Sequence, residues 1–244
     1  MSEILEIFKR AITNPFSYVT ILRFHTLYFK EHRAEGDTTH SFIFTGKSLP
    51  MWKAGQHGLF FLPGDGFWSE AWRVFSLAST PHEGHIMIGT KIPELHSDFK
   101  ERLLNLKPGD KIFMFGPIGE FHVSKKVKNI VAVAGGIGIT PLRSLILDLA
   151  KKHSLINVTL IYSSADDSYT YKDELEKAIK KHRQIKIIYV KTPEEVNLHL
   201  NEQVKKYSNS AHYFISGPAG MVASLRKSLK KKGIKHIVND PFRG

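Results

Sequence analysis

A glycine-rich turn that follows an apolar run is the strongest chemical signal in the sequence. Residues 130–134 read as a buried strand, and glycine occupies three of the next four positions. Thr140 is placed to cap a helix whose first residue is Pro141, a residue with a φ angle suited to that position. Such a turn brings backbone amides and the positive end of a helix close to a ligand. The pattern therefore predicts a pyrophosphate-binding turn.

Other kinds of chemistry are excluded or find no support. The chain has no cysteine, which excludes disulfides, zinc-thiolate sites, cysteine-ligated iron-sulfur clusters and thiol nucleophiles. His82 and His85 are three residues apart, but Pro81 and Gly84 indicate a turn rather than a helical metal-binding face, and we expect no metal site. Neither a Gly-x-Ser-x-Gly elbow nor a Walker lysine loop is present, so hydrolase and P-loop chemistry have no support.

Lysine and arginine outnumber aspartate and glutamate by 35 to 23, and the formal net charge is +12. Such a charge favours acidic partners or phosphorylated ligands. Basic runs such as 125–128 and 226–232 are more typical of a solvated helix face than of a nucleic-acid site, and we expect no nucleic-acid partner. A basic nucleic-acid binder stays an alternative, and it would show a steep salt dependence of binding.

Alternating strands and helices after residue 128 must position the glycine turn. Strands are expected at 130–134, 158–162, 185–190, 213–215 and 234–238, and helices at 141–152, 172–182, 194–206 and 221–232. Strands separated by helices of this length pair in parallel with right-handed crossovers. The second half is therefore predicted to be an α/β domain with a doubly wound, parallel, five-stranded sheet.

The first half instead shows short apolar or alternating runs separated by turn residues. Six strands are expected, at 18–24, 41–45, 58–62, 73–77, 85–90 and 111–115, together with one short helix starting at Ser97. They predict an antiparallel six-stranded β-barrel. The 244 residues thus divide into an N-terminal helix or arm (1–16), a barrel domain (17–124) and an α/β domain (128–244), with the basic segment 125–128 at the boundary.

The N-terminal arm has Ile4, Leu5, Phe8 and Ile12 on one face at helical spacing. We expect a helix over residues 2–12 that docks on the body of the protein or lies on a membrane surface. Charged residues interrupt its apolar stretch, so we expect no signal peptide, and no run reaches the roughly 18 apolar residues of a transmembrane helix. A soluble, cytoplasmic and monomeric protein is the resulting expectation.

Five motifs in a fixed order give the chain a family resemblance. They are Arg73-Val74-Phe75-Ser76, the stretch from Gly89 to Phe99, the stretch from Pro108 to Phe121, the glycine turn from Gly135 to Pro141, and Ser216-Gly217-Pro218. In this order they resemble the ferredoxin-NADP⁺ reductase superfamily of flavin-dependent oxidoreductases, over nearly the whole chain from about Ser17. The resemblance implies a barrel of Greek-key type that holds FAD rather than FMN, and an α/β domain that holds NADH or NADPH.

The first motif resembles the flavin motif Arg-x-Tyr-Ser/Thr. The resemblance implies that Arg73 binds the flavin pyrophosphate, that Phe75 packs on the isoalloxazine ring and that Ser76 hydrogen-bonds near flavin N5. Val74 lies within the same motif. Phe75 replaces the commoner tyrosine, which keeps the stacking but removes a hydrogen bond. The alternative is an ordinary strand with Val74 and Ser76 turned inward and no role in flavin binding.

The second motif resembles the family's other flavin segment, in which backbone amides and a serine at a helix start contact the pyrophosphate. The implied contact residues are Gly89, Thr90, Ser97, Asp98 and Phe99. A capped surface helix would need the same Ser97, so this reading has a structural alternative. The stretch from Pro108 to Phe121 is similar to the family's last barrel strand and the turn that leaves it, and we assign it a structural role.

The α/β domain carries the implied nicotinamide-dinucleotide contacts. They are Gly135, Gly136, Gly138, Thr140, Pro141, Ser163, Ser164, Gly217, Pro218 and Met221. Ser216 replaces the cysteine of the family's Cys-Gly-Pro loop, which approaches the nicotinamide ring. Phe242 in the C-terminal tail is implied to cover one flavin face. Ser76, Ser216 and Phe242 are therefore the residues expected to shape the place where the two rings meet.

Nicotinamide preference is read just after the second strand of the α/β domain, where an arginine or lysine meets a 2′-phosphate and an acid meets a free 2′-hydroxyl. The residues that follow Ser163 and Ser164 include Asp166 and Asp167, and no arginine is present there. Two acids would repel a phosphate, so the sequence favours NADH. Lys172 is the nearby cation that could reach over.

The resemblance implies a flavoprotein reductase that transfers hydride from NAD(P)H to FAD. The absence of cysteine excludes a fused iron-sulfur domain within this sequence, so the electrons are expected to pass to a separate acceptor, such as an acidic ferredoxin or flavodoxin or an oxygenase component. The alternative is a non-catalytic or regulatory subunit that binds flavin or nucleotide within a larger assembly.

Overall fold

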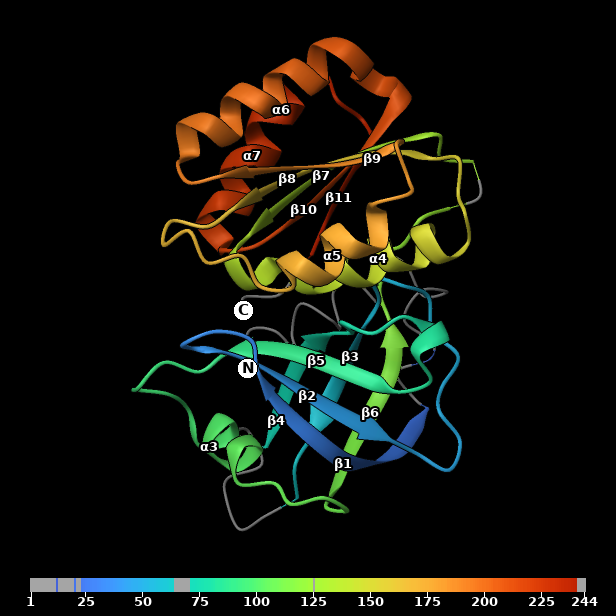
Figure 1. Ribbon diagram of the computed structural model, residues 1–244, viewed down its shortest axis with the longest axis vertical. Coiled ribbons are helices and arrows are strands. Elements are labelled where there is room, and N and C mark those ends of the chain that lie inside the picture. Colours follow the sequence, from blue (N-terminus) through green and yellow to red (C-terminus); the bar gives the residue numbers. More distant parts are fainter. Residues whose placement is uncertain (1–11, 13–19, 21–22, 64–70, 125, 241–244) are drawn as a thin grey trace. The chain divides into compact units, whose positions relative to one another are not determined.

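The computed structural model describes residues 12, 20, 23–63, 71–124 and 126–240. The chain divides into two compact units, Met1–His122 and Val123–Gly244, each with a sheet of its own (Figure 1). The division falls just before the basic segment 125–128, where the sequence places the domain boundary. The predicted helical arm lies outside the described residues except for Ile12.

The first unit is a curled, antiparallel, six-stranded sheet with the spatial order β4-β3-β6-β1-β2-β5. Its elements are β1 (Phe24–Ala34), β2 (Thr39–Thr45), β3 (His57–Phe61), β4 (Trp72–Ser76), β5 (Ile86–Lys91), α3 (Asp98–Leu104) and β6 (Lys111–Ile118). The order skips between strands that are consecutive in the chain, which is the predicted Greek-key arrangement. A core of buried apolar residues, including Leu27, Phe42 and Phe99, fills the interior.

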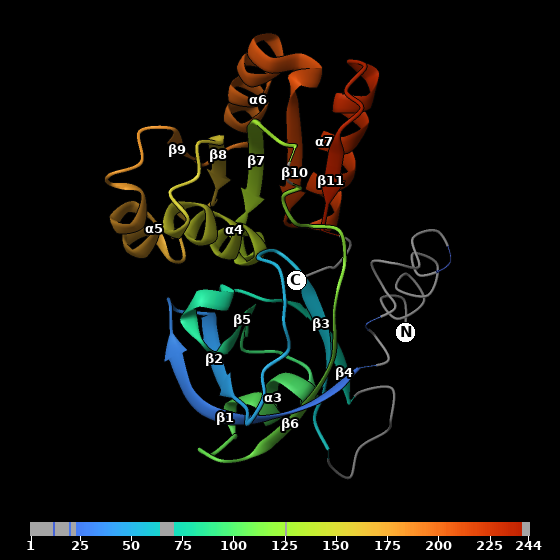
Figure 2. The same ribbon diagram turned by 90° about the vertical axis from the view of Figure 1, so that its right-hand side faces the viewer.

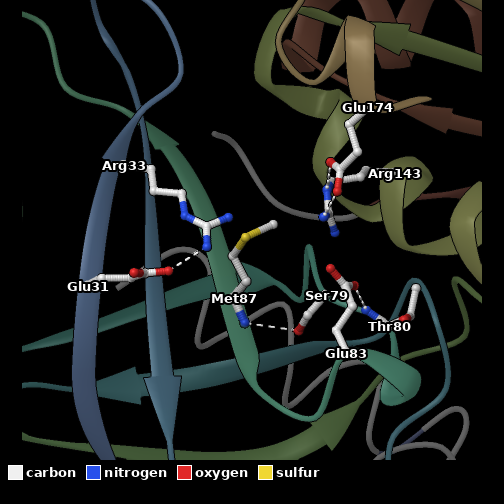
Figure 3. Close-up of polar contacts among 8 residues, drawn as sticks. All are labelled: Glu31, Arg33, Ser79, Thr80, Glu83, Met87, Arg143 and Glu174. Carbon is white, nitrogen blue, oxygen red and sulfur yellow. Dashed lines mark hydrogen bonds and ion pairs between the residues drawn. The ribbon is translucent and has the colours of Figure 1, made fainter. Parts of the chain in front are cut away.

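A narrow seam joins the two edge strands of this sheet, β4 and β5. Leu77 and Ile88 form an isolated antiparallel bridge, and the Ala78 amide donates to the Met87 carbonyl at 2.7 Å. The Met87 amide in turn donates to Ser79 Oγ at 2.9 Å, as Figure 3 shows. The sheet is therefore nearly closed into a barrel, but its last junction is much shorter than a strand pair.

The first strand is displaced from its predicted position. Most of the predicted strand 18–24 lies outside the described residues, and β1 begins at Phe24, where that prediction ends. Residues 30–33 are all charged or histidine, a composition typical of a loop. They nevertheless extend β1 to Ala34, because after a bulge between Phe29 and Glu31 their backbone pairs with β2, and most of their side chains are exposed at this end of the strand.

Two glycines with similar backbone angles allow the cost of a close contact to be measured. Gly55 and Gly109 have φ angles of +91° and +97°, but a Cβ at Gly55 would lie 2.0 Å from the Phe121 carbonyl oxygen, whereas Gly109 faces open space. We expect Gly109→Ala to destabilise the protein by about 1–2 kcal/mol through the left-handed conformation alone. Gly55→Ala should cost about 3–5 kcal/mol, because the Phe121 backbone must also shift.

Equilibrium urea unfolding of the two alanine variants measures this difference. Equal midpoints for Gly55→Ala and Gly109→Ala would contradict the contact between residue 55 and the end of the barrel.

The second unit is a parallel five-stranded sheet with the order β11-β10-β7-β8-β9, as predicted. Its elements are β7 (Asn129–Gly135), α4 (Ile139–Lys151), β8 (Asn157–Ser163), α5 (Lys172–Ile179), β9 (Ile185–Val190), α6 (Pro193–Tyr207), β10 (Ala211–Ser216), α7 (Ala219–Lys231) and β11 (Ile237–Asn239). All nine lie within a few residues of the predicted ranges. The alternation of apolar strands and amphipathic helices therefore predicts this unit well.

Helices cover both faces of the parallel sheet. α4 and α5 lie on one face and α6 and α7 on the other, and the strands run side by side between them (Figures 1 and 2). Val196 and Leu200 of α6 and Leu225 of α7 pack with strand residues in one buried cluster. A reciprocal pair of hydrogen bonds between Thr192 and Glu195 starts α6, with Pro193 as its first residue. In such an arrangement the loops that follow the carboxyl ends of the strands gather at one edge of the sheet, where open α/β sheets bind ligands.

Candidate functional site

The two predicted glycine loops of the α/β unit meet at the carboxyl ends of adjacent strands. β7 and β10 are hydrogen-bonded neighbours, and Ser216 pairs with Ala134. A Cβ on Gly138 would lie 2.5 Å from the Gly217 nitrogen and from the Ser216 carbonyl oxygen, so the two backbones touch. Residues 135–138 and 216–217 thus form one structure, which we call the glycine cradle.

The cradle lies at the point where the strand order reverses. From β7 the chain builds β8 and β9 on one side, and then returns to place β10 and β11 on the other side. Connections that leave in opposite directions open a crevice outside the carboxyl ends of the two central strands, and open α/β sheets bind their ligands there. The geometry of the cradle therefore fits a dinucleotide.

The residues behind the cradle explain why glycine is required. Met221, in the first turn of α7, and Pro218 lie against Gly135: a Cβ on that glycine would be 2.8 Å from Met221 Sδ and 3.0 Å from Pro218 Cδ. Both side chains were predicted as dinucleotide contacts from sequence. Both side chains pack against Gly135, and Met221 also packs against Gly217.

The predicted cap of α4 is wrong. Residues 136–138 form a 3₁₀ turn, α4 begins at Ile139, and Gly138 occupies the cap position without a side-chain hydrogen bond. Thr140 lies inside the helix and its Oγ1 donates to the Ile137 carbonyl at 2.6 Å, while Pro141 is the third helical residue. The 3₁₀ turn tightens the chain and starts the helix two residues earlier than a threonine cap would.

Ser216 has a buried partner that sequence analysis did not find. Its hydroxyl donates to Asp240 Oδ2 at 3.3 Å, and the Asp240 amide donates to the Ile215 carbonyl at 2.9 Å. Asp240 follows β11, the edge strand beside β10, and is buried. No local motif marks this aspartate, because its link to the Ser-Gly-Pro loop exists only in the folded sheet.

The loop after β8 carries the residues predicted to choose between the two nicotinamide nucleotides. Ser163 ends the strand, and Ser164 Oγ donates to Asp166 Oδ1 at 2.6 Å. Asp167 forms a 2.7 Å ion pair with Lys191, and the hydrogen bond from Lys191 holds the pKa of Asp167 below its usual value. The ammonium group of Lys172 lies 4.7 Å from the centre of the Tyr189 ring.

A buried arginine ties this region to the cradle helix. Arg143 of α4 donates through Nε and Nη2 to the Glu174 carboxylate of α5, at 2.7 and 2.5 Å (Figure 3). Its side chain is only 3% exposed, and its guanidinium stacks over Tyr171 at 5.2 Å. The pair fixes α5 against α4. A charged residue inside the apolar run 141–147 was a usable signal that sequence analysis overlooked.

In the barrel unit, the two predicted flavin segments come together around Phe99. Arg73 and Phe75 lie on β4, and Phe99 is in the first turn of α3. The Arg73 guanidinium carbon is 5.5 Å from the centre of the Phe99 ring, and the Phe75 ring is 5.8 Å from it. The strand alternates, so the buried side chain of Val74 lies on the opposite face from Arg73 and Phe75.

The start of α3 offers a buried hydroxyl. Ser97 precedes the helix with extended dihedral angles, but its hydroxyl makes no capping bond, and Oγ is buried with no hydrogen-bond partner. An orphaned buried hydroxyl is uncommon, and it fits a ligand with phosphate oxygens. Asp98 is exposed and lies 3.9 Å from Arg102, so its carboxylate is directed along the helix.

The remaining predicted flavin residues lie on the neighbouring strands. Thr90 is buried on β5 opposite His40, and Gly89 is opposite Ser41. Ser76 ends β4 opposite His57, a buried histidine that sequence analysis did not single out. A Cβ on Gly119 would lie 2.1 Å from the His57 ring, so the segment that leaves β6 packs directly on β3 beside Ser76.

Comparison with known proteins gives a family match within the second unit. Residues 132–227 match the family model of the oxidoreductase NAD-binding domain. Among solved structures, a cytochrome P450 reductase from Amycolatopsis superimposes with a TM-score of 0.78 at 20% identity, over 91% of this chain and 70% of that one. A ferredoxin-NADP⁺ reductase from Neisseria gonorrhoeae, solved with FAD and NADP, gives a TM-score of 0.74 at 18% identity, over 89% and 98%.

Both the barrel and the α/β unit are covered by these matches. The chain therefore has the two-domain fold of these reductases. A curated relative within reach of sequence comparison is one component of the Na⁺-translocating NADH-quinone reductase of Yersinia enterocolitica, 27% identical over 202 residues. The match covers 70% of this chain and 49% of the relative, and the chain spans about half the length of the curated relatives it matches.

The superpositions confirm the two-domain fold predicted from sequence, and the family-model match agrees with the resemblance. Other predictions lie beyond the described residues: Phe242 is one of them, and most of the arm 1–16 is another. No helix in the described part of the chain is both long and apolar enough to span a bilayer. Within those same ranges no three potential metal-ligating side chains cluster.

Proposed function

We propose that the chain is a flavin-dependent oxidoreductase that takes hydride from NAD(P)H onto bound FAD and passes electrons to a separate acceptor. The observation that carries the proposal is the glycine cradle, whose two loops touch at the reversal point of the parallel sheet. The structural neighbours named above include an NAD(P)-dependent reductase with bound FAD, which is the enzyme class predicted from sequence.

The barrel residues fit both the diphosphate and the isoalloxazine ring of FAD. Arg73 supplies a fork of donors suited to phosphate oxygens, and Ser97 supplies a buried hydroxyl without a partner. Phe75 offers apolar ring area beside Phe99, where an isoalloxazine would pack. Bound FAD would accept two electrons as hydride and release them one at a time. The role of the barrel is to hold and orient this group, with Ser76 near its reactive nitrogen.

The α/β residues are proposed to orient the nicotinamide. The cradle would hold the diphosphate through backbone groups, and Ser216 ends β10 next to Gly217 of the cradle. The carboxylate of Asp240 accepts a hydrogen bond from the Ser216 hydroxyl and so fixes the direction of that hydroxyl. No residue needs to act as a strong acid or base, because the transferred hydride carries its own electrons.

The electron acceptor is proposed to be a separate protein or a separate part of a larger assembly. One relative is a component of a Na⁺-translocating NADH-quinone reductase, and a structural neighbour is a cytochrome P450 reductase. Both names describe proteins that hand electrons onward. We propose the same for this chain, with an acidic redox protein or an oxygenase component as the candidate acceptor.

We further propose that NADH is preferred over NADPH. Asp166 and Asp167 lie in the loop after β8, Asp167 forms an ion pair with Lys191, and the Lys172 ammonium group lies over the Tyr169 and Tyr189 rings. Asp167→Asn frees Lys191 to meet a 2′-phosphate, so the ratio of kcat/KM for NADPH over NADH should rise about tenfold. Steady-state kinetics with both nucleotides measures this ratio.

The matched control for this change is Asp173→Asn, which removes another exposed acid in the first turn of α5. It should leave the ratio unchanged. A rise of the same size in both variants would mean that net charge, rather than the Asp167–Lys191 pair, sets the preference.

The proposed activity has a direct spectroscopic test. Protein reconstituted with FAD should be yellow and should bleach anaerobically when NADH is added. A yellow protein that does not bleach with either nucleotide would favour the alternative, a flavin-binding subunit without turnover. A protein that stays colourless after incubation with FAD would overturn both.

A further inference from the structure

The net positive charge of the protein is confined to its second unit. Residues 123–244 contain 22 lysines and arginines and ten aspartates and glutamates, whereas residues 1–122 contain 13 of each. The whole formal charge of +12 therefore belongs to the α/β unit. Binding one dinucleotide does not require a charge of this size, because the cradle uses backbone groups.

The topology collects these charges at one edge of the sheet. In a parallel α/β unit each helix runs against the strands, so the helix ends and the strand starts share the amino edge. Five segments at this edge, 126–128, 151–152, 180–183, 205–206 and 230–235, contain thirteen lysines and arginines and no acid. We call these five segments the basic edge. All thirteen residues are exposed.

The basic edge is hardly neutralised by the acids of the unit. Most of them, such as Asp166, Asp173 and Glu194, lie at the opposite edge, near the helix starts. Lys152 pairs with Asp148, but the described part of the chain places no other carboxylate within ion-pair distance of the basic edge. Cations in the last turn of a helix complement its dipole, yet the runs continue past the helix ends, to Arg183 and Lys235.

Hydrogen bonds link the loops of the basic edge, and one apolar side chain is exposed among them. Asn157 Nδ2 donates to Asn129 Oδ1 at 2.9 Å, and Gln184 Nε2 donates to the Ser154 carbonyl at 2.6 Å, so the loops before β7, β8 and β9 are linked. Between these links Leu155 is 92% exposed. A fully exposed leucine inside a field of lysines has no packing role in the unit.

We propose that the basic edge docks on a membrane surface rich in anionic lipid headgroups. Diffuse anionic surfaces attract clustered lysines electrostatically, and Leu155 would enter the boundary between headgroups and acyl chains. Twelve of the thirteen cations are lysines, which act as point charges, whereas nucleic-acid recognition favours the bidentate fork of arginine. The composition therefore favours a lipid surface over a nucleic acid.

The position of the basic edge argues against a role as the docking site of the electron acceptor. β7 is seven residues long, so the basic edge and the glycine cradle lie about 20 Å apart at about 3.3 Å per residue. A partner held at the basic edge would be remote from the nucleotide. The edge is therefore an anchor that leaves the carboxyl ends of the strands free, and this inference is independent of the proposed redox activity.

Co-sedimentation with lipid vesicles tests the proposal. The full chain should bind vesicles with about 30% phosphatidylserine, should ignore pure phosphatidylcholine vesicles, and should be released as salt rises from about 0.1 to 0.5 M. The triple variant Lys151→Glu, Lys180→Glu, Lys181→Glu should bind at least about tenfold more weakly, and Leu155→Ser about threefold more weakly.

The matched control changes three exposed lysines of the barrel unit, Lys47→Glu, Lys53→Glu and Lys107→Glu, with the same change in net charge. The affinity of this control for the anionic vesicles should fall by less than about twofold. Equal losses in both triple variants, or no binding by the unaltered chain, would overturn the proposal. Tighter binding to duplex DNA than to vesicles at equal phosphate concentration would also overturn it, in favour of a nucleic-acid partner. Circular dichroism and NADH bleaching of the variants report separately on folding and on the redox site.

Discussion

Gly138→Ala is expected to lower the rate of flavin reduction by NAD(P)H by about a hundredfold or more. The added Cβ would lie 2.5 Å from the Gly217 nitrogen and from Ser216, a distance that real Cβ atoms do not show, so the two loops of the cradle must separate. A displacement of about 1 Å in a positioning loop costs roughly a hundredfold in rate. Stopped-flow absorbance of the flavin during anaerobic mixing measures this effect.

Gly220→Ala is the matched control, because that glycine lies in the first turn of α7, beyond the cradle, and a Cβ there would meet nothing within 4 Å. The variant should reduce flavin at the normal rate and should be slightly more stable, since alanine favours a helix more than glycine by roughly 0.5–1 kcal/mol. A normal rate in Gly138→Ala would show that the contact between the two loops does not position the nucleotide.

Arg73→Ala should weaken FAD binding by at least about a hundredfold. Hydrogen bonds to charged groups contribute about 1.5–3 kcal/mol each, and the guanidinium is expected to make two of them to the diphosphate. Arg73→Lys keeps the charge but loses the fork, so its affinity should fall between the two. Titration of the apoprotein with FAD, followed by flavin fluorescence, gives the three dissociation constants.

Arg33→Ala serves as the comparison, because this arginine lies on β1 of the same unit and pairs with Glu31 at the surface (Figure 3). Its FAD affinity should equal that of the unaltered protein. If Arg73→Ala binds FAD normally, the assignment of Arg73 to the flavin diphosphate is wrong, whatever the activity of the variant.

The sequence predicts the α/β unit in more detail than the barrel, for a physical reason. The three central strands of the parallel sheet, β7, β8 and β10, are largely buried and read as apolar runs, as in Ile130–Ala134, and the helices between strands are amphipathic. Barrel strands carry weaker signals. Residues 30–33 of β1 are charged because they lie at an exposed end of the strand, and a pattern of hydrophobicity alone assigns them to a loop.

Local rules also fail where two elements compete for the same residues. Thr140 followed by proline is a good helix start by its residue types, but the 3₁₀ turn over 136–138 begins the helix earlier. The approach of Ser216 and Gly217 is compatible with this tight turn, because Gly138 has no side chain. This competition depends on a contact between residues about 80 positions apart, which no local motif records.

The parts of the site that sequence analysis missed are all long-range partners. Asp240 is reached by Ser216 across two neighbouring strands, and His57 meets Ser76 and Gly119 through strand pairing. Arg143 and Glu174 meet because α4 and α5 cover the same face of the sheet. The sequence supplies the residues that resemble known motifs, whereas the fold supplies the residues that hold them in place.

The seam between β4 and β5 has a consequence for how the protein is assembled. Arg73 and Phe75 lie on one side of it and Gly89 and Thr90 on the other, and among the described residues the Leu77–Ile88 bridge and the two hydrogen bonds of Met87 join the sheet between them. A flavin that contacts both strands would hold them together across this seam. In the apoprotein this seam should therefore unfold locally before the rest of the sheet. The amides of Ala78 and Met87 should take up deuterium rapidly, and the uptake should slow once FAD is added.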